Sequence, residues 1–271
     1  MNQLEQKEQK LLRLLAGLKK PAVALSGGVD SALLLAACCR AGLQPLALTA
    51  ATPLQPEFER HDAAAAASFC GCRLLVLELD PLTLPEFCAN DGRRCYFCKR
   101  LVFGAIKKQA QASGCQCLLD GANADDAGDY RPGMQAAREL EVISPLLACG
   151  LTKQEVRALA RKYGVAAADK SAYACLASRI AYGEHITYDK LAMVEQAEDA
   201  LRQLGLKDLR VRCHGNLARI EINPEQLVLA AGELRPQLTA AVHGAGFAYV
   251  SLDLDGFASG SMNRLLRQKN L

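Results

Sequence analysis

The sequence lacks a large excess of charge of either sign: 32 lysines and arginines stand against 29 aspartates and glutamates, a net charge of +3. A protein that binds nucleic acid as its bulk partner usually presents a strongly basic face, so this small excess argues against that class. Small anionic substrates stay compatible with the composition, because a few local arginines are enough to bind them.

Membrane-spanning and secretory segments are also missing. No apolar run reaches the roughly 20 residues that a membrane-spanning helix needs. The N-terminal stretch begins polar and lacks the charged start, the long apolar run and the small-residue cleavage site of a signal peptide. Its leucines recur at helical spacing, which predicts an amphipathic helix. We therefore expect a cytoplasmic protein without membrane segments.

Cysteine, by contrast, is abundant, with 12 residues in 271. Because no secretion signal is seen, we expect no disulfide framework, and most of these cysteines should be small core residues. Cys38 and Cys39, inside "LLLAACCRAG", fit that interpretation. A few other cysteines stand in patterns that packing alone does not require.

The order of apolar segments predicts an α/β fold with two domains. Short apolar strands alternate with helices in the first part of the chain, which favours a mainly parallel sheet covered on both faces. After Gly183 the pattern changes to a long helix, a hairpin turning near Gly215 and one more strand, a smaller α/β unit. We expect domains at 1–183 and 184–271. The strands expected in the first domain are 21–25, 45–50, 73–79, 117–120 and 141–146.

The stretch "SGGVDS" lies between a predicted strand and a predicted helix. Gly27 and Gly28 let the backbone approach an anion, and the loop amides with the hydroxyls of Ser26 and Ser31 can surround a pyrophosphate. The loop is not a Walker A motif, because the lysine-Ser/Thr ending is missing. Asp30 would repel phosphates unless a divalent cation lay between them, so we infer Mg²⁺. The alternative is a glycine-rich turn whose polar residues only cap the helix.

A second motif, "RRCYFCKR", holds Cys95 and Cys98 in a C-x-x-C pair flanked by four basic residues. Such cations favour thiolate. The pair suits a metal site, a redox pair or an iron–sulfur cluster, and two packed cysteines are the plain alternative. A full zinc site needs four ligands. The candidates for further ligands are Cys70, Cys72, Cys88, Cys115, Cys117 and Cys175.

The predicted hairpin carries charged residues at every second position. Arg210, Arg212 and His214 share one face of the first strand, and Arg219 and Glu221 share a face of the second. This face is either solvated or an anion clamp, since arginine suits bidentate recognition of phosphate or carboxylate.

By itself, "SGGVDS" resembles the PP-loop of the ATP pyrophosphatase superfamily. That resemblance implies that ATP is split between its α and β phosphates and that AMP goes onto an oxygen of the acceptor. Taken together, six stretches resemble the LarE family of ATP-dependent sulfur transferases, in order and over nearly the whole chain. They are "SGGVDS", "RRCYFCK", "DGANADDAGDYRPG", "ACLASRIAYGEHIT", "RVRCHGNLARIEI" and "GFASGSMN".

The LarE resemblance implies a reaction and a set of site residues. The substrate would be pyridinium-3,5-biscarboxylic acid mononucleotide, whose carboxylates are adenylylated and converted to thiocarboxylates on the way to the nickel-pincer cofactor of lactate racemase. The implied catalytic residues are Cys175 and Asp30. The implied binding residues are Ser26, Gly27, Gly28, Asp30 and Ser31 for ATP, Ser178, Arg179, Arg210 and Arg212 for the substrate, and Asp30 and Glu221 for a divalent cation.

The resemblance leaves two sources of sulfur open. Members with only the counterpart of Cys175 give up its sulfur and keep dehydroalanine. Members with three cysteines hold a 4Fe–4S cluster that can pass on an added sulfide. Because Cys95 and Cys98 accompany Cys175, the chain resembles the second kind. Sulfide or another sulfur donor would then be a partner, and the oligomeric state stays open.

Two other functions are compatible with a PP-loop. A tRNA thiolation enzyme shares the fold, but its binding to tRNA should be strong and salt-dependent, and the chain shows no basic stripe. A non-catalytic nucleotide or iron–sulfur sensor is the other alternative. It would release no pyrophosphate when given a carboxylate acceptor.

Overall fold

The computed structural model describes residues 2–128, 132–170, 174–258 and 260–263, so parts of two quoted motifs (129–131 and 259) lie outside the described residues. Two compact units are present. The first comprises Met1–Pro81 and Cys95–Tyr173, and the second comprises Leu82–Arg94 and Ala174–Leu271. The sequence pattern placed one boundary at 183. The contacts instead assign 174–183, and the short stretch 82–94, to the second unit.

A parallel sheet forms the centre of the first unit and confirms the expected α/β class. Its strand order is β3-β2-β1-β4, and each neighbouring pair is parallel. The strands are β1 (Pro21–Ala24), β2 (Leu46–Ala51), β3 (Leu74–Glu78) and β4 (Cys117–Leu119). These are four of the five strands that the sequence predicts for this part.

The fifth predicted strand, 141–146, is wrong. Only Ile143 pairs there, in an isolated parallel bridge with Leu119. Pro145 already begins helix α7 (Pro145–Ala148). Proline has no backbone N–H for a sheet and suits the first turn of a helix, so it ends the extended segment after one bridge.

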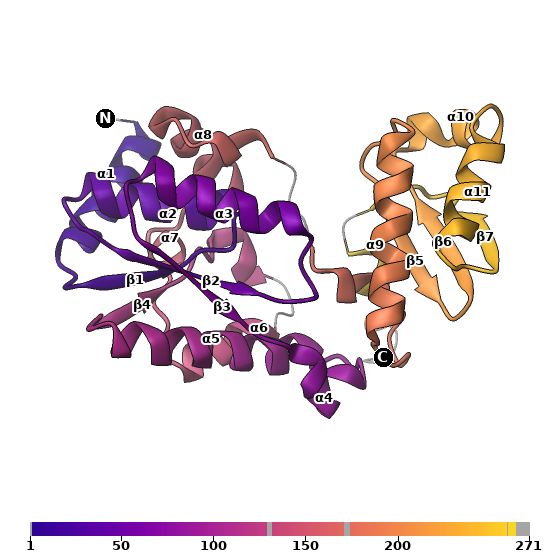
Figure 1. Cartoon of the computed structure of the whole chain (residues 1–271). Helices are drawn as coiled ribbons and strands as arrows, with labels where there is room; N and C mark the ends of the chain where they lie inside the picture. The colour runs from indigo at the N-terminus through magenta and orange to yellow at the C-terminus, as the bar shows by residue number, and fades with distance from the viewer. Residues whose placement is uncertain (1, 129–131, 171–173, 259, 264–271) are drawn as a thin grey trace. The chain divides into compact units, whose positions relative to one another are not determined.

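Helices cover both faces of this sheet (Figure 1). On one face lie α1, α2, α3 and α8, and on the other lie α5 and α6. The helices of this unit are α1 (Gln3–Ala16), α2 (Val29–Arg40), α3 (Glu57–Phe69), α5 (Arg94–Ala112), α6 (Pro132–Glu139), α7 and α8 (Lys153–Tyr163). A capping box of Thr152 and Glu155 opens α8, as the sequence predicts.

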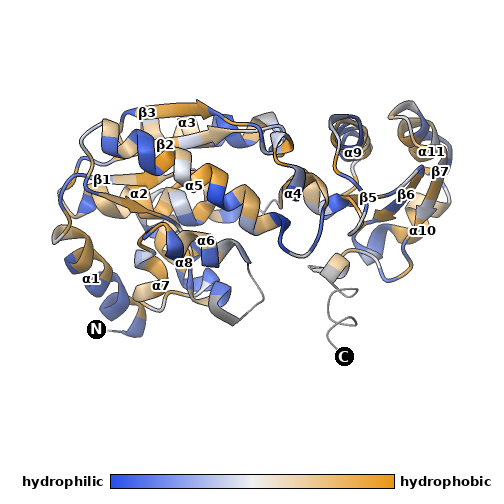
Figure 2. Cartoon of the chain, turned by 90° about the horizontal axis from the view of Figure 1, so that it is seen from below, coloured by the Kyte–Doolittle hydropathy of each residue, from blue (hydrophilic) through white to orange (hydrophobic). Residues whose placement is uncertain are grey.

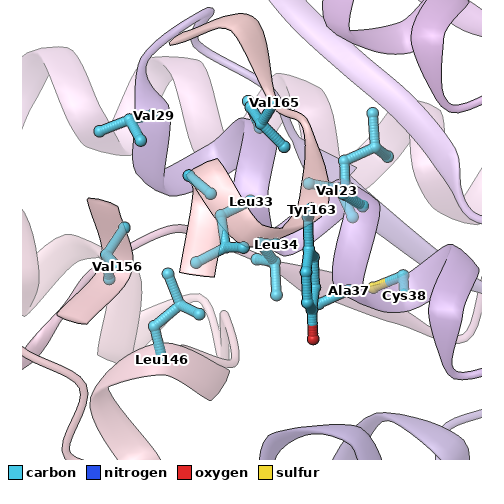
Figure 3. Close-up of a cluster of buried hydrophobic side chains, with 14 of the residues drawn as sticks. Val23, Val29, Leu33, Leu34, Ala37, Cys38, Leu146, Val156, Tyr163 and Val165 are labelled. Atoms are coloured by element: carbon cyan, nitrogen blue, oxygen red, sulfur yellow. The ribbon is translucent and has the colours of Figure 1, made fainter. Parts of the chain in front are cut away.

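Successive residues of a strand point to opposite faces of the sheet, so each strand contributes to two hydrophobic cores, one under each layer of helices. Ala22 belongs to the cluster on the α5 side with Phe103, whereas its neighbour Val23 belongs to the cluster on the α2 side. Figure 3 shows Val23, Leu33 of α2, Cys38 and Tyr163 within one cluster. Cys38 has no exposed surface, which confirms its assignment as a core residue.

Hydropathy follows these layers. In Figure 2 helix α1 shows hydrophilic and hydrophobic stretches side by side, as expected of the amphipathic helix that the sequence predicts. Its Leu11 and Leu15 are completely buried. No helix in the described part of the chain is both long and apolar enough to cross a membrane.

The second unit is a three-stranded sheet with order β5-β6-β7. Strands β5 (Arg210–His214) and β6 (Leu217–Glu221) form the predicted antiparallel hairpin, and β7 (Tyr249–Leu252) pairs parallel to β6. Gly215 makes the turn with a φ of +56°, a conformation that glycine adopts at low cost. Figure 1 shows α9 and α11 on one face of this sheet. The helices are α4 (Pro85–Cys88), α9 (Tyr188–Gln203), α10 (Leu227–Ala231) and α11 (Arg235–Gly244).

The close approach of α3 to the loop after β1 yields a stability prediction. Gly27 has a φ of +84°, and a Cβ there would lie 2.4 Å from the backbone oxygen of Glu59. Gly42 has nearly the same φ, +82°, but no atom within 4 Å of an added Cβ. Gly42→Ala should therefore cost only the left-handed strain of about 1–2 kcal/mol. Gly27→Ala should cost that and a further ~1–3 kcal/mol of overpacking.

Urea unfolding followed by circular dichroism would compare the two variants. Gly42→Ala is the matched control, because it carries the same backbone strain without the clash. Equal losses of stability in the two variants would contradict the close packing of this loop against α3.

Candidate active site

The loop Ser26–Ser31 joins the carboxyl end of β1 to the first turn of α2. Ser26 and Gly28 are exposed, whereas Gly27 and Ser31 are buried. The Ser31 hydroxyl donates to the Gly28 carbonyl (3.1 Å) and lies 3.2 Å from the Ser26 hydroxyl, and it accepts from the Ser26 amide (3.2 Å). The buried Ser31 side chain therefore fixes the conformation of the loop through these hydrogen bonds. The first N–H groups of α2, which have no partner within the helix, form a site suited to an anion.

Asp30 lies in the first turn of α2, and two residues from other segments hold its carboxylate. The Asn123 side-chain amide donates to it at 3.0 Å, and the Lys153 ammonium forms an ion pair with it. Sequence reasoning inferred Mg²⁺ because a carboxylate beside a phosphate site would be repelled without a cation between them, and it missed the ammonium of Lys153. One signal was available: Lys153 is the first residue of α8, where the helix dipole disfavours a cation.

The turn after β4 packs directly on the start of α2. A Cβ on Gly121 would lie 2.7 Å from the Ser31 amide nitrogen and 3.0 Å from the Asp30 carbonyl carbon. Asn123 is buried, and Asp125 accepts a hydrogen bond from the Lys153 amide at 2.9 Å. Three segments far apart in the sequence therefore meet at this edge of the sheet, as expected for the carboxyl ends of parallel strands.

Cys95 and Cys98 lie in the first turns of α5, one turn apart and so on one face of the helix. Cys95 is exposed and Cys98 is half-buried. Tyr96 between them is buried and donates its hydroxyl to Glu139 at 2.8 Å, which fixes this turn against α6. Thiols near a helix N-terminus are favoured as thiolates. The pair belongs to the first unit, and Cys175 belongs to the second.

The other cysteines that sequence reasoning offered as ligands are packing residues. The sulfurs of Cys39 and Cys72 lie 3.5 Å apart, and burial raises the pKa of Cys70 to about 11 and of Cys72 to about 12. Thiols of this kind stay protonated at neutral pH. Among the described residues no three His, Cys, Asp or Glu side chains gather as a metal site. The remaining candidates, Cys88, Cys115 and Cys117, are buried or half-buried.

Cys175 is half-buried and directly precedes the 3-10 helix Leu176–Arg179. The Arg179 guanidinium, which has no exposed surface, folds back under it. It donates to the carbonyl oxygens of Ala174 and Cys175, the latter at 3.2 Å, and to the Ser178 hydroxyl at 3.0 Å. Arg179 therefore binds the backbone on both sides of the Cys175 α-carbon.

Glu198 of α9 completes this arrangement, and sequence reasoning missed it. Its carboxylate is fully buried, accepts from Arg179 at 2.8 and 3.2 Å, and accepts the Val211 amide at 3.1 Å. Burial alone would raise the pKa of Glu198, but the hydrogen bonds and charge of Arg179 hold it below the ordinary value. An ionised carboxylate thus links the Cys175 segment to α9 and β5.

Arg212 and Glu221 form a second buried pair on the hairpin. Arg212 donates to Glu221 at 2.7 and 3.0 Å and to the Ser178 carbonyl at 3.2 Å. Arg219 and the Ser261 hydroxyl also contact the Glu221 carboxylate, at 3.1 and 2.7 Å. Because Arg212 and Glu221 are buried, they do not lie on a solvated face. A carboxylate held by two arginines is also a poor fit for the divalent cation expected at Glu221.

Arg210 differs from these two arginines. It is half-buried, donates to the Leu209 carbonyl at 2.7 Å, and its guanidinium lies over the Phe257 ring with 4.9 Å to the ring centre. Ser178 is also half-buried, next to the Arg179 guanidinium.

Comparison with known proteins gives relatives that match all or most of the chain. No protein-family model matches the chain. An uncharacterized protein of Synechocystis sp. is 41% identical over 266 residues, covering 97% of this chain and 99% of that protein. An uncharacterized protein of Methanocaldococcus jannaschii is 30% identical over 207 residues, covering 76% of this chain and 79% of the other. The NMN synthetase of Francisella tularensis is similar in fold, with a TM-score of 0.52, 15% identity, and coverage of 91% and 95%.

One relative has a named activity. The pyridinium-3,5-bisthiocarboxylic acid mononucleotide synthase of Lactiplantibacillus plantarum is 34% identical over 277 aligned residues, covering 100% of this chain and 99% of that enzyme. Similarity at this level extends through both compact units. The chain therefore belongs to the LarE family, that of the pyridinium-3,5-bisthiocarboxylic acid mononucleotide synthase.

Proposed function

We propose that this chain is an AMP- and pyrophosphate-forming sulfurtransferase that converts carboxylates of pyridinium-3,5-biscarboxylic acid mononucleotide into thiocarboxylates for a nickel-pincer cofactor. The observation that carries the proposal is the similarity to the Lactiplantibacillus plantarum synthase over the whole length of both chains. The phosphate loop of the first unit and the supported cysteine of the second supply the two chemical functions that such a reaction needs.

The first unit would bind ATP and activate the carboxylate. The amides at the start of α2 and the hydroxyl of Ser26 face the place that phosphates would occupy, and Lys153 brings a positive charge to it. Asp30 would hold Mg²⁺, which offsets phosphate charge when bound. Activation is required because a carboxylate oxygen is a poor leaving group, whereas AMP is a good one.

In the second unit Cys175 would handle the sulfur. In the sacrificial route its thiolate attacks the acyl-adenylate carbonyl, AMP leaves, and a thioester forms. A base then removes the Cys175 α-proton, and the electron pair forms the Cα–Cβ double bond. The Cβ–S bond breaks, the thiocarboxylate leaves, and dehydroalanine stays in the chain. Arg179 supports this step, because it holds the carbonyl groups on both sides of that α-carbon.

In the alternative route Cys95, Cys98 and Cys175 would hold a 4Fe–4S cluster. The accessible Cys95 and the half-buried Cys98 and Cys175 fit such ligation better than the protonated packing cysteines do. Such a cluster would supply sulfur from an added sulfide without consuming the chain.

The four residues named for the substrate divide into two kinds. Ser178 lies just after Cys175, Arg210 lies on the hairpin, and both side chains are half-buried. We assign these two residues to contact the mononucleotide. Arg179 and Arg212 direct their donors to protein partners, Glu198 and Glu221. We assign them the positioning of the Cys175 segment.

Replacing Lys153 tests the ATP half. Lys153→Met should raise the KM for ATP about ten- to a hundredfold, because a charge-assisted contact contributes roughly 1.5–3 kcal/mol. Release of pyrophosphate at varied ATP concentrations would measure this. Lys7→Met is the control. Lys7 of α1 forms an ion pair at 2.7 Å with Glu155, which lies on α8 as Lys153 does but does not contact Asp30. If the two variants change the KM equally, Lys153 has no role at the phosphates.

Replacing Cys175 tests the sulfur half. Cys175→Ala should still release pyrophosphate when given ATP and the mononucleotide, but it should form no thiocarboxylate, since the thiolate is the nucleophile. Mass spectrometry of substrate and protein after one turnover would check this. The wild-type chain should either lose the mass of one hydrogen sulfide or keep its mass and bind about four irons. Thiocarboxylate formation by Cys175→Ala at the wild-type rate would exclude this role.

A further inference from the structure

Asp62 of α3 lies against the phosphate loop and forms an ion pair there. A Cβ added to Gly27 would be 3.2 Å from the Asp62 Cβ, so the Asp62 side chain borders the loop directly. The Lys170 ammonium pairs with the Asp62 carboxylate. Both residues belong to the first compact unit, as the loop does. A second lysine besides Lys153 is therefore held next to the loop by an aspartate.

A groove beside the start of α2 also places Lys170 near the loop. Ala32 of α2 directly follows Ser31 in the sequence. It lines this groove together with Asp62 and Lys170. Apolar residues of α3 and of the segment 165–167 make up most of the remaining lining. Lys170 therefore lies beside the first turns of α2, whose N–H groups without a helical partner suit an anion.

Helix α8 fixes the backbone that carries Lys170. The Arg157 guanidinium donates to the carbonyl oxygens of Ala168 and Lys170, at 2.6 and 2.7 Å. The Lys170 amide donates to the Ala167 carbonyl at 3.2 Å. Arg157 follows Lys153 by four residues on α8, and residues at this spacing share a face of a helix. One face of α8 therefore supplies a cation to the loop and holds the backbone of a second cation.

Stability does not account for the pair of Asp62 and Lys170. The Lys170 side chain is 53% exposed and that of Asp62 is 20% exposed, and ion pairs in contact with water contribute little to stability. A carboxylate beside a phosphate site would repel the ligand unless a cation accompanied it. Asp30 and Lys153 form a similar, partly exposed pair on the same loop. Each of these weak pairs can open when an anion binds.

We propose that Lys170 binds the terminal phosphates of ATP and the pyrophosphate that leaves, and that Asp62 and Arg157 position it. The inference rests on the ATP half of the proposed function. Without nucleotide, the Lys170 ammonium pairs with Asp62. When ATP binds, the ammonium moves to oxygens of the β and γ phosphates.

This placement gives Lys170 a part in the adenylylation step. A carboxylate oxygen of the substrate attacks the α phosphorus, and the bond from that phosphorus to the oxygen bridging to the β phosphate breaks. The electron pair stays on the leaving pyrophosphate, whose negative charge grows as the bond breaks. A cation already placed at the terminal phosphates stabilises that charge. Lysine suits the task, because its flexible stem and three donors can follow a phosphate group from bound ATP to product.

Separate titrations of pyrophosphate and AMP test the inference. Each probe is added with Mg²⁺ to the full-length protein, and isothermal titration calorimetry gives its Kd. Lys170→Met keeps the aliphatic stem and should weaken pyrophosphate binding about tenfold, because a charge-assisted contact is lost. Its affinity for AMP should equal that of the wild type, because AMP lacks the phosphates that Lys170 contacts. Arg157→Met should weaken pyrophosphate binding by a smaller factor and also leave AMP binding unchanged.

Lys162→Met is the matched control. Lys162 lies on α8 and pairs with Glu8, and its side chain is 55% exposed, close to the 53% of Lys170. Its loss changes the net charge by the same amount, and Glu8 keeps its hydrogen bond from the Tyr163 hydroxyl at 3.0 Å. Lys162→Met should bind pyrophosphate as the wild type does. Circular dichroism shows which variants fold, and Lys170→Gln serves if Lys170→Met does not.

Pyrophosphate release from ATP and the mononucleotide separates the two proposals. If the wild type releases and binds pyrophosphate, equal affinities for it in folded Lys170→Met and Lys162→Met would overturn the role of Lys170 alone. Equal weakening of pyrophosphate and AMP binding in Lys170→Met would also overturn its role at the terminal phosphates. A wild type that neither releases nor binds pyrophosphate would overturn the ATP half of the proposed function, and this inference with it.

Discussion

The ion pair between Arg179 and Glu198 is the interaction on which the second unit's site depends. Neither side chain has any exposed surface, so both charges have been removed from water. Leaving one such charge without its partner typically costs about 3–5 kcal/mol, whereas an apolar pair of similar volume would often be as stable. Stability alone therefore does not explain the pair. Its geometry does, because the same guanidinium holds the backbone around Cys175.

The two units use charge in different ways. In the first, Asp30 and Lys153 form an ion pair that is partly exposed, at an edge of the sheet where three loops meet. A pair in that setting can be rearranged by an incoming anion at modest cost. In the second, Arg179, Arg212, Glu198 and Glu221 are buried and satisfy one another. The first arrangement suits binding and release of a nucleotide, and the second suits a segment that must hold one shape.

Local patterns predicted the parts of the fold that local chemistry decides. Four strands of the first sheet, the capped helix α8 and the hairpin at Gly215 follow from periodicity and turn residues. The prediction of a strand at 141–146 was wrong because Pro145 begins a helix within that apolar run. Local periodicity does not identify the partners of Lys153 and Glu198, because Lys153 pairs with a residue 123 positions away and Glu198 with one 19 positions away. The assignment of 82–94 to the second unit is likewise invisible locally, because it depends on contacts with residues about 90 positions later in the chain, such as those of Asn90 with Ala181 and Gly183.

The high pKa values of the packing cysteines also make the chain chemically selective. At neutral pH a thiol of pKa about 11 or 12, such as that of Cys70 or Cys72, is almost entirely protonated, and exchange with disulfides or persulfides requires the thiolate. Disulfides and persulfides would therefore not react with the thiols of Cys70 and Cys72 at neutral pH. Burial of Cys70 and Cys72 therefore keeps these two thiols from taking part in such exchange at neutral pH.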